Sequence, residues 1–495
     1  MKYTFIVASF FTMLLFLPGL LVSIDAQPIG SEFRANSFTA NFQQNSDVAM
    51  DANGNFVVVW ESWIPYSMGV IDSIQEIHGQ RYMADGSAIG NEFRIHEELP
   101  VGQTKPAVAM DQHGNFVVTW TGIAYQDDTL VSTTDIYARR FQANGTPLSS
   151  TVKVNTYNIE IQQYPRISMD TLGDFVIVWE SNTTSANEIY GQRFSASGVK
   201  AGSEFKILNS NVFIESQKRP VVSLDFDGDF VVAWQADYIG HPDSIDIYAQ
   251  RYQANGVAIG SDFIVNTFKP GVQEFASIAS DSDGDFVVAW QSTGQDGTGY
   301  SIFGQRFQPN GAPVGVEFRI NTFVSSSHYS IGPDLVLDKS GNFIATWGEQ
   351  GIDGDAIGIS AQCYLADGTK LGNEFLVNTY SEFLQISPSI AMAANGKYVI
   401  VWESSDEDDT NYLDVRGQLY QSKFLESCSP DPLMLGGSES GTVSYHTQQD
   451  ITSSQMISTG ANMSYQAGTF ITLGIGFEVA NNATFTGAIG SCNVN

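Results

Sequence analysis

The stretch DSDGDFVVAWQS, residues 281–292, joins a charged turn to an uninterrupted apolar run that ends at a tryptophan. The phrase occurs seven times, beginning at Asp51, Asp111, Asp170, Asp225, Asp281, Asp338 and Ala393. Its tryptophans are Trp60, Trp120, Trp179, Trp234, Trp290, Trp347 and Trp402, spaced 55 to 60 residues apart. A near-constant period of this length indicates a repeat architecture.

Each repeat reads as four β-strands. A strand of small residues leads through an Asp-Gly or Asn-Gly turn, a strong hairpin signal, into the apolar run. Both faces of that run are apolar, so neighbouring repeats must cover both. Strands such as IYGQRF (189–194) and EFRINTF (317–323) complete the unit. Seven such units predict an all-β, seven-bladed β-propeller with the tryptophans in its core.

The two ends of the repeat region predict how the ring closes. Residues 30–38, GSEFRANSF, read as a fourth strand with no repeat before it, and the last repeat lacks its fourth strand. The N-terminal strand is therefore expected to complete the last blade and to remove two exposed sheet edges. The third strand of every repeat carries Gly or Ala at one position, which is expected to make room for a large ring of the neighbouring repeat. These residues are Gly79, Ala138, Gly191, Ala249, Gly304, Ala361 and Gly417.

The termini suggest export. Residues 1–26 combine one lysine with a long apolar run, which predicts a signal peptide and a secreted or cell-surface protein; an uncleaved anchor is the alternative. The propeller is assigned residues 27–425. Residues 428–495 lack the repeat and predict a small β domain or short β-solenoid, closed by a Cys428–Cys492 disulfide. Cys363 occupies a strand position and is expected to be a buried thiol.

The repeat GSDFIVNTFKPGVQEFASIASDSDGDFVVAWQSTGQDGTGYSIFGQRFQPNGAPVGVEFRINTF (260–323) resembles tandem repeats of large secreted bacterial proteins of the hemolysin-type and adhesin-like classes. The resemblance covers residues 29 to 424 and implies an extracellular β-propeller. The tail pattern, from YQAG at 465 to the cysteine at 492, resembles a C-terminal element of secreted Bacteroidota proteins. Asn481, Asn482 and Gly487 depart from that pattern. The nonapeptide calcium repeats of hemolysin-type proteins are absent.

Two turns carry the pattern expected of a calcium site. Alternating carboxylates over five residues supply several of the six to eight oxygens that Ca²⁺ takes. The residues are Asp225, Asp227, Asp229, Asp281, Asp283 and Asp285. The alternative is an ordinary hairpin turn with solvated aspartates. No cofactor is firmly implied otherwise, and the scattered histidines show no metal-ligand spacing.

The loops that follow each tryptophan are the most variable part of the repeat, and loops on a rigid scaffold carry function. A ligand site is expected on this acidic face, where carboxylates would bind cations or basic ligands and aromatic rings would stack on sugars. The candidates are Trp63, Tyr125, Asp127, Asp128, Tyr238, Asp243, Asp353, Asp355, Asp406, Asp408 and Tyr412.

Composition restricts the partners. The net charge of −31 disfavours nucleic acid, and no segment after the first 26 residues is apolar enough to span a membrane. No catalytic motif stands out. We therefore expect a secreted or cell-surface monomer that acts in binding or adhesion to an extracellular glycan or protein and is not an enzyme. The alternative is a secreted carbohydrate-active enzyme, a glycoside hydrolase or polysaccharide lyase, that uses carboxylates on the variable face.

Overall fold

The structure is a computed structural model. It describes residues 26–39, 41–65, 73–97, 102–125, 132–157, 161–182, 187–207, 214–238, 241–297, 299–322, 330–405, 412–422 and 424, together with short strands between 433 and 489. These residues contain β-strands and no helix, and therefore no helix that could cross a membrane. The predicted signal peptide lies outside them, as do Cys428 and Cys492.

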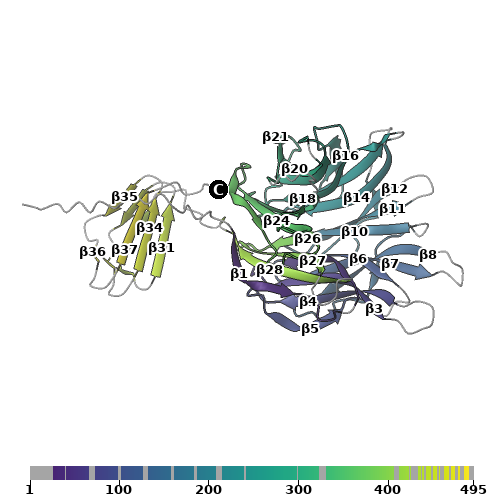
Figure 1. Ribbon diagram of the computed structural model, residues 1–495, viewed down its shortest axis with the longest axis horizontal. Helices are drawn as coiled ribbons and strands as arrows, with labels where there is room; N and C mark the ends of the chain where they lie inside the picture. The colour runs from purple at the N-terminus through teal and green to yellow at the C-terminus, as the bar shows by residue number, and fades with distance from the viewer. Residues whose placement is uncertain are drawn as a thin grey trace, which may run out of the picture.

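The repeat region consists of antiparallel four-stranded units (Figure 1). The first strands are β2 (Gln43–Met50), β6 (Gln103–Met110), β10 (Ile161–Met169), β14 (Ile214–Leu224), β18 (Gln273–Ser280), β22 (Ser330–Leu337) and β26 (Gln385–Met392). The second strands are β3 (Phe56–Pro65), β7 (Phe116–Tyr125), β11 (Phe175–Asn182), β15 (Phe230–Tyr238), β19 (Phe286–Thr293), β23 (Phe343–Gln350) and β27 (Lys397–Ser405).

The third and fourth strands complete each unit. The third strands are β4 (Ser73–Tyr82), β8 (Ser132–Phe141), β12 (Asn187–Phe194), β16 (His241–Tyr252), β20 (Tyr300–Phe307), β24 (Ile357–Tyr364) and β28 (Leu413–Gln421). The fourth are β5 (Ala88–Arg94), β9 (Val152–Lys153), β13 (Phe205–Lys206), β17 (Ala258–Ile264), β21 (Pro313–Arg319), β25 (Lys370–Leu376) and, for the last unit, β1 (Gln27–Arg34). The units of β6 and β10 share one eight-stranded sheet through a parallel contact between Ile161 and Thr134. The all-β propeller prediction is confirmed.

The core lies between the units. All seven repeat tryptophans are completely buried, as predicted, and the hydrophobic clusters combine side chains of adjacent units. Most tryptophan indoles donate a hydrogen bond to a buried carboxamide of the first strand, as Trp290 does to Gln273 at 3.1 Å. A buried donor without such a partner costs about 1–3 kcal/mol. Cys363 is buried in β24, as expected.

The small residue of the third strand faces a ring, but the ring belongs to the fourth strand of its own unit. A Cβ at Gly191 would lie 2.7 Å from Phe205 Cζ, and one at Gly417 would lie 2.6 Å from Phe33 Cζ. Phe205 then leans on Tyr252 of the next unit, with ring centroids 5.7 Å apart. The expected ring of the neighbouring repeat is therefore replaced by a ring of the same unit, because Phe205 and Phe33 lie directly opposite Gly191 and Gly417 in the strand pairing.

The ring closes as the sequence predicts. Strand β1 pairs antiparallel with β28, from Gln27 opposite Gln421 to Arg34 opposite Arg416 (Figure 1). The carboxylate of Glu32 on β1 accepts hydrogen bonds from the backbone N–H and the hydroxyl of Thr379, at 2.8 and 2.7 Å. The closing strand is thus paired with the last unit through its backbone and tied by Glu32 to the segment that follows β25 of the preceding unit.

Arginines of the third strand bind neighbouring units. Arg193 Nη1 donates to the Ala254 carbonyl at 2.5 Å, and Arg306 Nη1 donates to the Ala366 carbonyl at 2.6 Å. Arg81, Arg140 and Arg251 repeat the contact. These residues connect units and belong to the scaffold.

The tail forms a second all-β element. Its parallel sheets contain β29 (Leu433–Leu435), β32 (Asp450–Ser453) and β35 (Phe470–Leu473); β30 (Ser438–Glu439), β33 (Met456–Ile457) and β36 (Glu478–Val479); and β31 (Thr442–Thr447), β34 (Asn462–Ala467) and β37 (Thr484–Ile489). Each strand pairs in parallel with the strand three places later in the chain, as β29 does with β32 and β31 with β34. This is the arrangement of a short β-solenoid.

Candidate functional site

Every first strand contains a bulge with one residue in the left-handed region of backbone space. These residues have φ between 34 and 55° and occupy equivalent positions in the repeats: Asn45, Lys105, Tyr164, Arg219, Phe275, Gly332 and Ser387. The pairing register with the second strand shifts at each of them. Non-glycine residues rarely adopt this conformation, and backbone strain of this kind clusters at functional sites.

At five of the seven bulges, the residue that follows the tryptophan of one unit holds the bulge of the next unit. Glu180 Oε1 accepts a 2.6 Å hydrogen bond from the Arg219 N–H, and Glu403 Oε1 accepts one of 2.7 Å from the Asn45 N–H. Gln235 accepts the N–H of Phe275 in the same way at 3.3 Å. The backbone of the bulge is therefore fixed from the neighbouring unit, independently of the side chain that the bulge presents.

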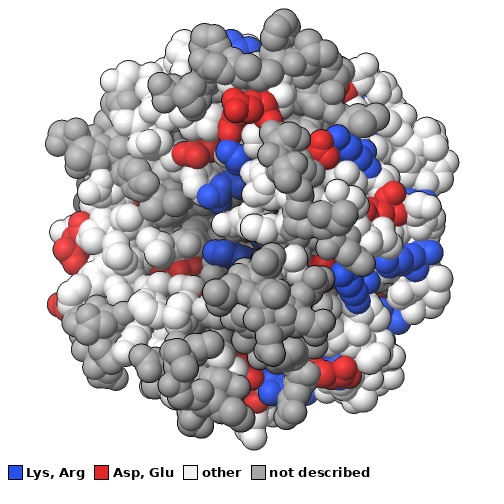
Figure 2. Space-filling model, turned by 90° about the vertical axis from the view of Figure 1, so that its right-hand side faces the viewer, with Lys and Arg blue, Asp and Glu red and all other residues white. Residues whose placement is uncertain are grey.

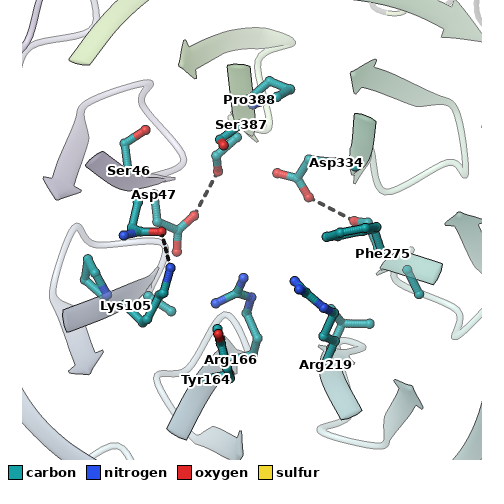
Figure 3. A pocket seen from close by; sticks show the side chains of 18 of the residues that line it. Ser46, Asp47, Lys105, Tyr164, Arg166, Arg219, Phe275, Asp334, Ser387 and Pro388 are labelled. Atoms are coloured by element: carbon teal, nitrogen blue, oxygen red, sulfur yellow. Dashed lines mark hydrogen bonds between the residues drawn. The ribbon is translucent and has the colours of Figure 1, made fainter. Parts of the chain in front are cut away.

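The bulges surround a cavity of about 410 Å³ that all seven first strands line. Two residues beyond each bulge residue, a further set of side chains faces the same cavity: Asp47, Ala107, Arg166, Val221, Ser277, Asp334 and Ser389. Figure 3 shows that Arg166 and Arg219 point inward from one side and that Asp47 and Asp334 lie on the other. We call this cavity the axial pocket.

The basic side of the axial pocket is formed by β6, β10 and β14. The side chains of Arg166 and Arg219 are exposed, and neither forms an ion pair with another described residue. The Arg219 guanidinium lies 4.3 Å from the centre of the Phe275 ring and 5.8 Å from that of Tyr164. Lys105 Nζ donates to Asn45 Oδ1 at 2.8 Å, and burial lowers its pKa.

The acidic side has carboxyls from β2 and β22. Asp334 accepts hydrogen bonds from the Ser277 hydroxyl and the Ile390 N–H, both at 2.9 Å. Burial and the charge of Asp47 raise the pKa of Asp334 to about 6 despite these bonds. Burial also raises the pKa of Asp47, whereas the Val108 N–H and the charge of Arg166 oppose that rise. Asp334 thus keeps its proton at mildly acidic pH.

A third carboxyl, that of the buried Glu403, also lines the pocket. Burial raises its pKa to about 7, against the opposing effects of the Asn45 N–H and the charge of Lys105. Groups with shifted pKa values that converge on one cavity are a physical sign of a functional site.

The charge distribution on the loop face differs from the expected one. Figure 2 shows Lys and Arg side chains near the middle of the face from which the post-tryptophan loops project, with Asp and Glu side chains among and around them. The variable face was expected to be acidic, yet its middle is basic.

The described candidates of the variable loops lie outside the axial pocket. The ring of Phe42 contacts both Trp63 and Tyr412. Its centroid lies 5.8 Å from that of Trp63 and 5.3 Å from that of Tyr412. Tyr238 donates a 2.6 Å hydrogen bond to Asp246, and Asp355 accepts the Phe383 N–H at 2.7 Å. Asp353 likewise accepts an amide, that of Asn378, at 3.2 Å. Asp127, Asp128, Asp406 and Asp408 and the side chains of Tyr125 and Asp243 lie outside the described residues.

The two turns proposed for calcium use their carboxylates within the hairpins. Asp281 Oδ1 accepts the N–H groups of Asp283 and Asp285, both at 3.0 Å. Asp225 accepts the N–H of Asp227 at 3.0 Å, and Asp229 accepts that of Ala254 at 2.8 Å. Within the described part of the chain, no group of three or more Asp, Glu, His or Cys side chains is arranged to hold a metal ion. These contacts fit the hairpin-turn alternative.

Sequence reasoning missed the axial pocket, although the sequence contains a signal for it. The first strands consist mainly of small and apolar residues, yet NSD (45–47), TKP (104–106), YPR (164–166), KRP (218–220) and GPD (332–334) place charge or proline at the same step. Charge at the bulge residue or two residues beyond it, varying from repeat to repeat, marks side chains that line the axial pocket.

No protein-family model and no curated protein matches the chain. Several solved structures resemble it. A protein of unknown function from Dyadobacter fermentans has 11% identity and a TM-score of 0.49, and the match covers 81% of this chain and all of that one. The polysaccharide lyase Uly1 has 12% identity and a TM-score of 0.47, over 81% and 98% of the two chains. An α-L-arabinanase from Penicillium chrysogenum has 14% identity and a TM-score of 0.41, over 63% and 92%.

These comparisons correct the expected function. The similar structures with an assigned activity are carbohydrate-active enzymes, which contradicts the expectation of a non-enzymatic binding or adhesion protein. At identities of 11–14% the likeness is one of fold, so a function for this chain has to be argued from its own site.

Proposed function

We propose that the chain is an exported carbohydrate-active enzyme, a glycoside hydrolase or polysaccharide lyase, whose substrate enters the axial pocket from the loop face. The observation that carries the proposal is the convergence of two carboxyls, Asp47 and Asp334, with basic side chains across one cavity. Burial raises the pKa of both carboxyls, but the charge of Arg166 opposes the rise at Asp47, whereas the charge of Asp47 adds to the rise at Asp334.

Hydrolysis is the chemistry that the carboxyl pair supports. Asp334 holds its proton up to about pH 6 and would donate it to the glycosidic oxygen as the bond to the sugar breaks. Asp47, closer to the charge of Arg166, would act as the ionised partner that takes a proton from the attacking water. Tyr164 and Phe275 supply ring faces on which a sugar can stack.

Tyr164 favours elimination as the second candidate. Its ring lies 5.7 Å from Lys105 Nζ and 5.8 Å from the Arg219 guanidinium. A tyrosine hydroxyl can take part in removing a carbon-bound proton of a sugar ring and in protonating the glycosidic oxygen that leaves. A polysaccharide lyase would use Tyr164 in this way.

Export is supported by the N-terminal apolar segment, residues 1–26, and by the resemblance of the tail to an element of secreted proteins. An extracellular position would bring the pocket into contact with polysaccharides, which are too large to enter a cell.

The test is turnover of a polysaccharide panel by the purified chain from residue 27 onward. New reducing ends report hydrolysis in the absence of an unsaturated product, and ultraviolet absorbance of an unsaturated product reports elimination. Asp334→Asn and Asp47→Asn should each lower the rate by about 100-fold or more, the usual contribution of general acid–base catalysis. If elimination is the reaction, Tyr164→Phe should cause the large loss.

Asp338→Asn is the matched control, because Asp338 accepts the N–H groups of Ser340 and Asn342 in a hairpin turn away from the axial pocket. Its activity should equal that of the unaltered protein. Absence of turnover across the panel, or full activity in all three pocket variants, would refute the proposal.

A further inference from the structure

We propose that the axial pocket recognises an acidic sugar unit, with Arg166 and Arg219 as the pair that binds its anionic group. This inference rests on the proposed function, since it names the class of carbohydrate that the same pocket takes. The anionic group is a carboxylate, as in a uronic acid, or a sulfate ester.

The argument begins with the charge balance of the chain. It has 54 Asp and Glu residues against 23 Lys and Arg, so cations have acidic partners in excess. Arg139, Arg319 and Arg416 form ion pairs, and the third-strand arginines bind backbone carbonyls. Arg166 and Arg219 stand apart, because both side chains are exposed at the pocket without an ion pair to another described residue.

The geometry of the two arginines leaves hydrogen-bond donors for a ligand. Arg166 Nη1 donates to the Pro165 carbonyl at 3.1 Å, and no other described residue accepts from its guanidinium. Arg219 lies 4.3 Å from the Phe275 ring centre, a cation–π distance. Both groups point into the same cavity from adjacent strands (Figure 3). Two guanidinium forks match the paired oxygens of a carboxylate or sulfate.

The scaffold holds the pair in advance of binding. The backbone of Arg219 has φ of 51° and is bonded to Glu180, while Pro165 restricts the backbone that leads into Arg166. Lys105 is not counted in the pair, because it is a single ammonium without the planar fork of a guanidinium, and it donates to Asn45. A backbone that is fixed before the ligand arrives lowers the entropic cost of binding.

The acidic side of the pocket is compatible with an anion. Asp334 lies across the cavity from the arginines and accepts two hydrogen bonds, and it carries a proton below about pH 6. In that state it does not repel an anionic sugar, and the charge of the second carboxyl on that side, Asp47, is opposed by that of Arg166. The pocket should therefore bind acidic sugars more tightly in mildly acidic solution than in alkaline solution.

The experiment measures binding of the chain from residue 27 onward by calorimetry to three matched probes. These are a polyuronate oligosaccharide, the same oligosaccharide after chemical reduction of its carboxyl groups to alcohols, and a sulfated oligosaccharide. The intact polyuronate should bind at least about tenfold more tightly than the reduced form, a difference near 1.4 kcal/mol. A preference for the sulfated probe would assign the anionic group to sulfate.

Variants separate this inference from a general effect of charge. Arg166→Gln and Arg219→Gln should each weaken binding of the acidic probe by about tenfold or more and leave the weak binding of the reduced probe unchanged. Arg193→Gln, on the outer part of a unit and bound to Ala254, is the matched control and should bind normally. Near-ultraviolet circular dichroism verifies that each variant is folded.

The two proposals fail separately. Acidic probes that bind through Arg166 and Arg219 without turnover of any polysaccharide would sustain this inference and refute the enzyme. Turnover confined to neutral polysaccharides, equal binding of the acidic and reduced probes, or unchanged affinity in both arginine variants would overturn the acidic-sugar inference.

Discussion

The backbone N–H of Arg219 donates a 2.6 Å hydrogen bond to Glu180 Oε1, and the two residues belong to neighbouring units of the ring. A carboxylate behind the pocket wall therefore sets the position of a guanidinium inside the pocket. The same slot is filled by Gln235 and Gln291 elsewhere, which accept the equivalent N–H through a carboxamide oxygen.

Glu180 does not line the axial pocket, so its removal should weaken ligand binding through its effect on the backbone of Arg219. We expect Glu180→Ala to raise KM for an acidic substrate about five- to tenfold and to lower the free energy of unfolding by about 1–3 kcal/mol, the cost of an unpaired buried N–H. Glu180→Gln should restore both, because glutamine serves in this slot in other units. Equal KM values for all three proteins would show that Glu180 does not position Arg219.

Stability should fall as pH rises from about 4 to 7. Glu403 and Asp334 have folded-state pKa values of about 7 and about 6, above the ordinary values of 4.5 and 3.8. The folded protein therefore binds more protons than the unfolded chain in this window, and the free energy of unfolding decreases with pH. Thermal unfolding at several pH values should give a higher midpoint near pH 4.5 than near pH 7.5.

Variants at one slot test the source of this pH dependence. Glu403→Gln should flatten the pH profile and raise stability at pH 7.5 by about 1–3 kcal/mol, because a neutral acceptor avoids burial of charge. Gln235→Glu, the reverse change in the equivalent slot, should steepen the profile. A pH profile unaffected by either change would place the coupled protons elsewhere.

The closing strand should depend on the ring contact that Phe33 makes. Phe33 packs against Tyr82 with ring centroids 5.1 Å apart and covers Gly417. Phe33→Ala should cost about 2–4 kcal/mol and expose the N-terminal segment to limited proteolysis, read by mass spectrometry. Phe93→Ala removes the equivalent ring of another unit, whose strand β5 is tethered at both ends, and should leave the N-terminus protected. Equal protection of the N-terminus in both variants would argue against closure through β1.

Calcium should have little effect on stability. The carboxylates of Asp225 and Asp281 already accept backbone N–H groups, and burial raises the pKa of Asp281 to about 6, opposite to the effect of a bound cation. We expect the same unfolding midpoint with calcium and with chelator. A rise in calcium, accompanied by one or two bound ions, would instead support the metal sites.

The fold was predictable because it depends on what the repeats share. Burial on both faces of the FVVVW strand requires neighbours on both sides, and the unpaired strand at residues 30–38 indicates closure. The axial pocket was not found because it depends on what the repeats do not share. Lys105 and Arg166 lie in first strands at or next to a bulge, and both line the axial pocket.

The loop candidates stay predictions, and the structure adds the partners that the sequence did not reveal. Variability and exposed aromatic residues drew attention to Trp63 and Tyr412, yet both rings pack on Phe42. Tyr238 likewise donates a hydrogen bond to Asp246. Polar and aromatic residues in loops contact other residues of the chain as well as ligands. The sequence does not show which partner each one has.

The seven bulges make the pocket a natural site for combinatorial engineering. Five of the seven bulge residues are fixed through a backbone N–H, so a library that varies positions 45, 105, 219, 275 and 332 together would change what the cavity selects while the ring stays intact. The native choices at the seven bulges are Asn, Lys, Tyr, Arg, Phe, Gly and Ser, none of them β-branched, as left-handed backbone requires. Diversification by any residue except Val, Ile, Thr and Pro should therefore yield folded clones with new ligand preferences.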